Sequence, residues 1–131
     1  LVAAAGFVAY TEHDRKHSYD AWMGASLADM RQHLAEGDVV FERTRHVTHE
    51  TPATHGELSE HLTVESLREA MREQAEQAAE TDGGDVYLYD TSYLKSPWKQ
   101  MARDIELDEP WPAWLEPVAS GDRWELLKYA D

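Results

Sequence analysis

The sequence contains no cysteine, and this absence excludes two kinds of protein at once. Without thiols there is neither a disulfide framework nor a thiolate metal site. No apolar run approaches the roughly 20 residues that a helix needs to span a bilayer. The apolar stretch at residues 1–8 is short and lacks a basic leader, which is atypical of a signal peptide. We therefore expect a cytoplasmic or nuclear protein.

Basic residues are scarce. The chain has 12 Lys and Arg against 26 Asp and Glu, which gives a formal net charge of −14. A surface this negative repels the phosphates of nucleic acids and of anionic lipids. We therefore expect no direct binding to nucleic acid or to a membrane.

Common catalytic signatures are also missing. The sequence has no G-x-S-x-G, no phosphate-binding G-x-x-x-x-G-K and no G-x-G-x-x-G. The pair Gly83-Gly84 precedes an apolar run, so it predicts a turn rather than a nucleotide loop. No two of the many carboxylates stand out as an acid–base pair. The catalytic residues, if there are any, stay unknown at this level.

The apolar content is sufficient for a folded core: 42% of the 131 residues are hydrophobic. This predicts one α+β domain over residues 1–131. Ser26 is typical of a helix N-cap, and the spacing of the apolar residues behind it predicts a helix over 27–35. Residues 39–47 are rich in β-branched residues and predict a strand, whereas the polar residues 48–60 predict a loop.

The clearest helix of the sequence follows Thr63, a typical N-cap. Strand 86–90 comes next, and Ser96-Pro97 predicts a short helix reaching 101 or 103. Residues 123–129 are expected to form a final helical turn or two. Only two convincing strands result, and an isolated pair is rarely stable. We therefore expect the sheet, and with it the domain, to continue beyond residue 131.

All seven histidines lie between positions 13 and 61. His55, Glu57 and His61 include the H-x-E spacing of a facial iron triad. Because they fall in the expected loop, solvated side chains are the favoured interpretation, and no metal site is assigned to them. His13 and His17, four residues apart, are interpreted in the same way. A histidine-based zinc protein stays open as a weaker alternative.

Tyr87 and Tyr89 should point to one side of strand 86–90, since side chains alternate along a strand. Packing of both rings is the interpretation that the residues favour. The alternative is that their hydroxyls, beside Thr91, donate hydrogen bonds to a carboxylate ligand. Four tryptophans in this part of the chain are expected to anchor the core: Trp98, Trp111, Trp114 and Trp124.

The stretch from Asp85 to Trp114, DVYLYDTSYLKSPWKQMARDIELDEPWPAW, carries a family resemblance. Its YLYDTS strand, the short helix after it and the phrase DIELDEP resemble the segment just upstream of the metal-binding barrel in JmjC or cupin-like oxygenases. The run WELLKY at 124–129 resembles the tract that introduces that barrel. The resemblance covers residues 36 to 131, most closely 85 to 131. The iron triad H-x-D…H of the family has no counterpart in this chain.

The resemblance implies the N-terminal part of a cupin-like double-stranded β-helix (a jelly roll) whose barrel is incomplete here. It implies a protein hydroxylase or demethylase that uses Fe(II) and 2-oxoglutarate, with this chain alone binding neither and inactive in isolation. Carried over by position, Tyr87 would contact the 2-oxoglutarate carboxylate, and Tyr89 and Thr91 would face a protein substrate. The alternative is a non-catalytic acidic α+β module that binds other proteins. The oligomeric state is not indicated.

Overall fold

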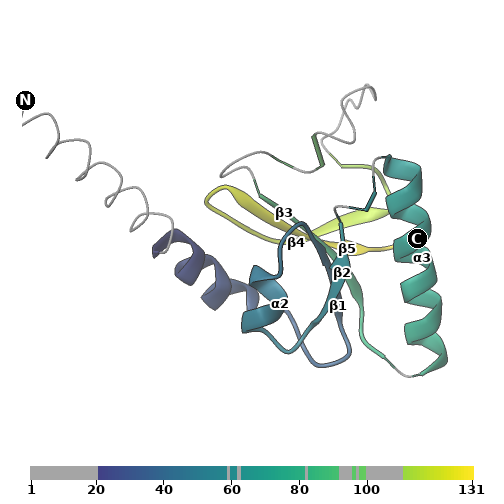
Figure 1. Cartoon of the computed structure of the whole chain (residues 1–131), viewed down its shortest axis with the longest axis horizontal. Coiled ribbons are helices and arrows are strands. Elements are labelled where there is room, and N and C mark those ends of the chain that lie inside the picture. Colours follow the sequence, from purple (N-terminus) through teal and green to yellow (C-terminus); the bar gives the residue numbers. More distant parts are fainter. Residues whose placement is uncertain are drawn as a thin grey trace, which may run out of the picture.

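The computed structural model describes residues 21–58, 60–61, 63–81, 83–91, 96, 98–99 and 111–131. They form an α+β fold around one five-stranded mixed sheet (Figure 1). The strands are β1 (Val39–Glu42), β2 (Thr54–Glu57), β3 (Val86–Thr91), β4 (Leu115–Gly121) and β5 (Trp124–Tyr129). The helices are α2 (His46–Glu50), α3 (Val64–Glu80) and the helical residues 21–30.

The strand order is β2-β1-β3-β5-β4. Strands β1, β2 and β3 are mutually parallel, whereas β5 runs antiparallel to both β3 and β4. Among the described residues β2 and β4 each have a neighbour on one side only, so the sheet is open. The expectation of only two strands is wrong, and β3 is the middle strand of the five. It is buried on both faces, as its continuous apolar sequence requires.

Each face of the sheet has its own core. On one face α3 packs Leu67 and Met71 onto Leu88 and Leu127, all fully buried. On the other face lie the helix at 21–30, the turn after it and α2, which Figure 1 shows on the side of the sheet opposite α3. This second core also takes the side chains of β3 that point away from α3. The alternation of side chains along β3 thus supplies both cores.

Two elements agree closely with the prediction from the sequence. Thr63 caps α3: its hydroxyl accepts a hydrogen bond from the Ser66 amide. The helix ends at Glu80, and Gly83 donates its amide to the Ala78 carbonyl. The strand predicted over 86–90 is β3, which is one residue longer.

Other boundaries differ from the prediction. Ser26 is not an N-cap but lies within the helix, where its hydroxyl bonds the Trp22 carbonyl four residues earlier. The described helix ends at residue 30 rather than 35, although Leu27, Met30 and Leu34 are buried as expected. Only residues 39–42 of the predicted strand 39–47 are extended.

The last predicted helical turns are a strand. Residues 123–129 contain β5, preceded by a tight hairpin turn in which Arg123 has a positive φ of 63°. β5 is held between β3 and β4, and these two pairings decide its conformation. In the predicted helix after Ser96, residues 98–99 are helical and the rest of it lies outside the described residues.

Candidate functional site

The most unusual polar cluster lies where β1 and β2 end, and it includes the H-x-E pair. Residues 54–57 form β2, so the prediction of a loop at 48–60 is wrong for this segment. The parallel register pairs Val40 with His55 and Glu42 with Glu57. Neighbouring residues in register share a face, so His55 and Glu57 lie on the side of Glu42 and α2. The solvated interpretation of His55 is also wrong, because its side chain is only 8% exposed.

His55 lies between two carboxylates. Its Nε2 is 3.0 Å from Glu57 Oε2, which is hydrogen-bonding distance. Its Nδ1 faces Glu42 Oε1 at 3.7 Å, too far for a hydrogen bond. Glu42 Oε1 and His55 Nδ1 are the two buried side-chain polar atoms in the described part of the chain that lack a hydrogen-bond partner.

The carboxyl of Glu42 is almost completely enclosed, with 1% of the residue exposed. Its second oxygen, Oε2, accepts a hydrogen bond from the Thr48 amide at the start of α2. Burial raises the pKa of Glu42 to about 7, against the lowering effects of the Thr48 and Val47 amides and of the Arg45 charge. A carboxyl in such a setting exchanges its proton near neutral pH, as general acids and bases do.

Burial limits what this cluster can do chemically. Since Glu42 has almost no exposed surface, it meets no substrate in this conformation. Glu57 is the member that reaches solvent, with 35% of its side chain exposed. The arrangement is therefore suited to holding a proton on Glu42 inside the fold.

The third member of the predicted cluster lies elsewhere. His61 Nδ1 is 2.7 Å from the Ser66 hydroxyl near the start of α3, and its ring is 6.1 Å from that of Phe41. Phe41 points to the opposite face of β1 from Glu42. No three His, Asp or Glu side chains of the described residues are placed to hold a metal ion. His13 and His17 lie outside those residues.

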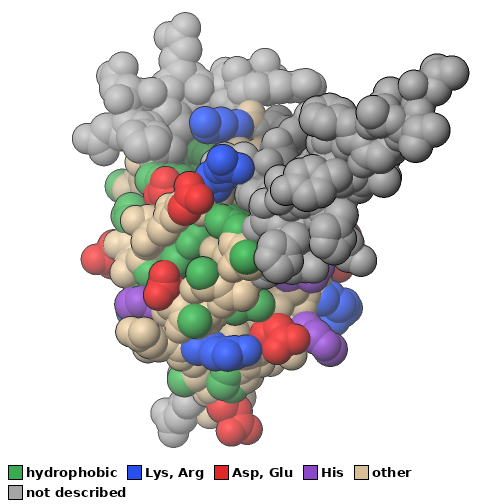
Figure 2. All heavy atoms as spheres, turned by 90° about the vertical axis from the view of Figure 1, so that its left-hand side faces the viewer, with side chains coloured by type: hydrophobic (Ala, Val, Ile, Leu, Met, Phe, Trp, Pro, Cys, Tyr) green, Lys and Arg blue, Asp and Glu red, His purple; other side chains and the backbone are tan. Residues whose placement is uncertain are grey.

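Two further histidines border a surface pocket. A hollow of about 460 Å³ lies between the helix at 21–30 and α2, lined in part by Arg31, His46 and His49. Arg31 donates from Nε to the Glu50 carbonyl at 3.0 Å and lies 3.4 Å from its carboxylate, which ties the two elements together. Figure 2 shows this side of the molecule, where acidic, basic and histidine side chains are interspersed. The net negative charge is therefore not concentrated there.

The predicted ligand-contacting residues lie on β3. Tyr87 and Tyr89 do share a face, as predicted, and both rings are buried in the core beneath the helix at 21–30, with 7% and 6% exposure. Burial, with the Asp38 and Asp85 charges, raises the pKa of Tyr87 to about 12. The Thr91 hydroxyl donates to the Arg123 carbonyl at 2.9 Å. Neither phenol is open to a cofactor in this arrangement.

One polar anchor was not predicted. Asp90, at the end of β3, accepts hydrogen bonds from the Ser96 hydroxyl and from the Trp98 amide. Burial raises the pKa of Asp90. Trp98 lies within 6.0 Å, ring centre to ring centre, of Trp114. The sequence signal was the D-x5-S-P-W spacing, in which an acid precedes a helical turn that begins with free amides.

The predicted core role of the tryptophans is confirmed for Trp98, Trp114 and Trp124, which are 4%, 7% and 4% exposed. Trp111 is partly exposed and packs against Trp98 at 5.4 Å. It is therefore the one of these four rings that also borders solvent.

In the part of the chain that the structure describes, no helix has the length and hydropathy to span a membrane. Comparison with known proteins yields no family model, no curated protein and no solved structure that matches this chain.

Proposed function

We propose that this chain is the N-terminal region of a JmjC or cupin-like protein hydroxylase or demethylase that depends on Fe(II) and 2-oxoglutarate. In this role residues 1–131 form a supporting sheet with its helices, and the iron triad belongs to another part of the protein. The sequence from Asp85 to Trp114 supports the proposal through its resemblance to that family. A cytoplasmic or nuclear location and a protein substrate are parts of the same proposal.

The observation that carries the proposal is the open sheet. The run that resembles the start of the barrel, residues 124–129, is a strand, and it pairs with β3 from Tyr87↔Lys128 to Thr91↔Trp124. A barrel that continues from this sheet adds its strands at an edge. Among the described residues β2 has a neighbour only at β1, so such an edge is present.

The described residues do not fit an iron site, since no three His, Asp or Glu side chains converge among them. They do not fit a 2-oxoglutarate site either, because Tyr87 is covered. For Tyr87 to contact a 2-oxoglutarate carboxylate, and for Tyr89 and Thr91 to face a substrate, the layer formed by residues 21–34 has to leave the sheet. Under this proposal the cofactors are bound by the complete protein.

The test uses the protein encoded by the complete reading frame. Titration with Fe(II) and 2-oxoglutarate without oxygen should change its tryptophan fluorescence in a manner that depends on both ligands. Residues 1–131 alone serve as the control and should not respond. A reading frame that stops directly after Asp131, or a complete protein that is insensitive to both ligands, contradicts the proposal.

A non-catalytic interaction module is the second candidate, and one observation favours it. The net charge of −14 is combined with an apolar groove at the open β4 edge. A module of this kind would bind a basic partner and would show no dependence on iron or 2-oxoglutarate.

A further inference from the structure

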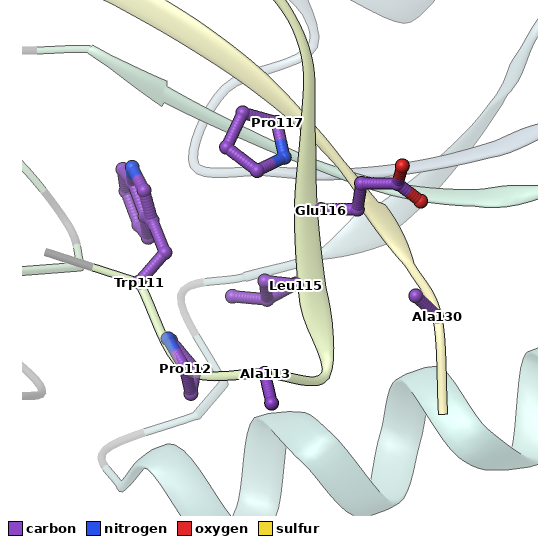
Figure 3. Close-up of a pocket in the computed structure, with 7 residues that line it drawn as sticks. All are labelled: Trp111, Pro112, Ala113, Leu115, Glu116, Pro117 and Ala130. Atoms are coloured by element: carbon purple, nitrogen blue, oxygen red, sulfur yellow. The ribbon is translucent and has the colours of Figure 1, made fainter. Parts of the chain in front are cut away.

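The edge strand β4 borders a groove of about 450 Å³. Figure 3 shows Trp111, Leu115 and Pro117 along one side of the strand and the carboxylate of Glu116 on the other. Pro112 and the chain near Ala130 complete the lining. An apolar wall and a single acidic group therefore lie on opposite sides of this edge strand.

The apolar wall is held in place before any ligand arrives. Trp111 donates its indole Nε1 to Glu125 Oε2 at 2.8 Å and packs against Trp98. Pro112 and Pro117 have little conformational freedom of their own. A ligand that binds against this wall therefore has to order few groups of the protein.

The outer edge of β4 offers hydrogen-bond acceptors but lacks donors at its first residues. Ala130 donates its amide to the Trp114 carbonyl at 3.1 Å, and Leu115 lies opposite Tyr129. Leu115 and Tyr129 are therefore a non-hydrogen-bonded pair of the antiparallel ladder, so the N–H and C=O groups of Leu115 point away from β5. The same holds for Pro117, two residues further along β4. The Leu115 amide is bound to the Pro112 carbonyl, and proline has no amide proton. From 115 to 117 the outer edge thus presents carbonyl acceptors and no donors.

This pattern disfavours one class of ligand. A regular added strand needs donors as well as acceptors along the edge. The register also shifts between Pro117 and Ala119, which is a bulge of the kind that protects edge strands. A second copy of β4 would likewise lack outward amide donors to pair with these carbonyls. Neither a paired strand nor self-association fits this edge.

The charge indicates a different ligand. Glu116 is exposed, and Lys128, its neighbour across the strands, forms an ion pair with Asp85 at 3.4 Å. Arg68, which lies over the Trp114 ring, is bound to Asp131. With a net charge of −14 on the whole chain, the groove attracts cations.

We propose that this groove binds a basic, extended segment of another protein through an Arg or Lys side chain. The aliphatic stem of that side chain lies along Trp111 and the two prolines. Its cationic head donates hydrogen bonds to Glu116 and to the outward carbonyls of Leu115 and Pro117. Arginine and lysine carry only donors, which matches an edge that has only acceptors. The proposal does not depend on the oxygenase assignment.

The experiment measures fluorescence anisotropy with a short labelled peptide of alternating proline and arginine. The peptide should bind residues 1–131, and added salt should weaken the binding. A peptide with glutamate in place of arginine should not bind. Glu116→Lys should raise the dissociation constant about fivefold or more, because it replaces an attraction with a repulsion.

Glu73→Lys is the matched control, since it makes the same change of charge at an exposed site on α3. It should leave the dissociation constant within about twofold, as expected for a distant screened charge. Equal effects of the two variants would show that only net charge matters and would overturn the proposal. Equal binding of the two peptides would do the same.

Pro117→Val tests the edge separately. Valine restores an outward donor, so this variant should self-associate more than the wild type in sedimentation velocity runs. A wild-type chain that already dimerises through β4, with Glu116→Lys abolishing the dimer, would identify a second copy as the occupant and would refute the proposal.

Discussion

Glu42 and His55 lie on adjacent parallel strands and face each other across 3.7 Å with one unpartnered polar atom each. Such buried groups are normally hydrogen-bonded, so an exception in a core requires a physical reason. Burial of this carboxyl raises the pKa of Glu42 to about 7, so below that pH it is neutral. With its proton, Glu42 loses the charge that burial opposes.

This relationship predicts how stability depends on pH. The folded-state pKa of about 7 lies above the unfolded value of 4.5, so the folded protein binds more protons between these two values. The stabilisation is complete below pH 4.5 and is lost as pH rises through 7, by about 3 kcal/mol in total. Glu42→Gln cannot ionise and should lack this loss.

Urea denaturation from pH 4.5 to 8, followed by tryptophan fluorescence, measures the effect. Glu73→Gln, the same change at an exposed position of α3, is the control and should keep the wild-type dependence. If Glu42→Gln and the wild type show the same dependence on pH, Glu42 does not carry the proton.

Ser96→Ala should lower the free energy of unfolding by about 1–3 kcal/mol, because it leaves a buried carboxylate short of a donor. Among the described residues Asp90 would then keep the Trp98 amide as its donor. The emission of the buried tryptophans should shift as the turn loosens. Ser120→Ala, at an exposed position of β4, is the control and should change stability little. An equal response from both variants would refute the anchoring role of Asp90.

Thr63→Ala should destabilise the protein by about 1 kcal/mol, since the Ser66 amide loses its acceptor. Thr63→Ser keeps a hydroxyl at the same position and should recover most of the loss. Thermal unfolding of the three proteins under one condition provides the comparison. Equal melting temperatures for the alanine and serine variants would show that the cap contributes nothing.

Gly84→Ala should cost about 1–3 kcal/mol through steric overlap in a packed region. A Cβ at this position would lie 1.9 Å from Asp38 Oδ1 and 2.8 Å from the Asp38 amide nitrogen. Asp38 accepts hydrogen bonds from the Ala35 and Asp85 amides, so moving it disturbs two turns. Gly24→Ala is the control, because a Cβ there meets nothing within 4 Å. A stable Gly84→Ala would mean that Asp38 can move freely.

The sequence allowed good predictions where local signals were strong. Thr63 and the apolar spacing behind it define α3, and the apolar run before Thr91 defines β3. The prediction failed at β2, whose sequence THGE has no strand pattern. Its conformation comes from pairing with β1, with Gly56 packed so closely on Phe41 that a Cβ would approach the ring to 2.9 Å. It also failed at β5, where Trp124 to Tyr129 fit a helical turn equally well until their neighbours are known.

The candidate site, too, could be predicted from the sequence only in part. The H-x-E spacing was visible, but its partner Glu42 is 13 positions before His55, and only the parallel pairing of β1 and β2 brings them together. Asp90 and the outward carbonyls beside Pro117 likewise acquire their roles from distant segments. The roles of Tyr87, Tyr89 and Thr91 in a cofactor or substrate site stay predictions.

By itself the sequence determined the net charge, the absence of thiol chemistry, helix α3 (the longest helix of the described residues) and strand β3. These depend on composition and on interactions within a few residues along the chain. Tertiary structure alone decided the order of the strands, the burial of Glu42 beside His55 and the lack of outward donors at residues 115–117 of β4. Each of these requires that segments far apart in sequence share one sheet, and local propensity carries no information about that pairing.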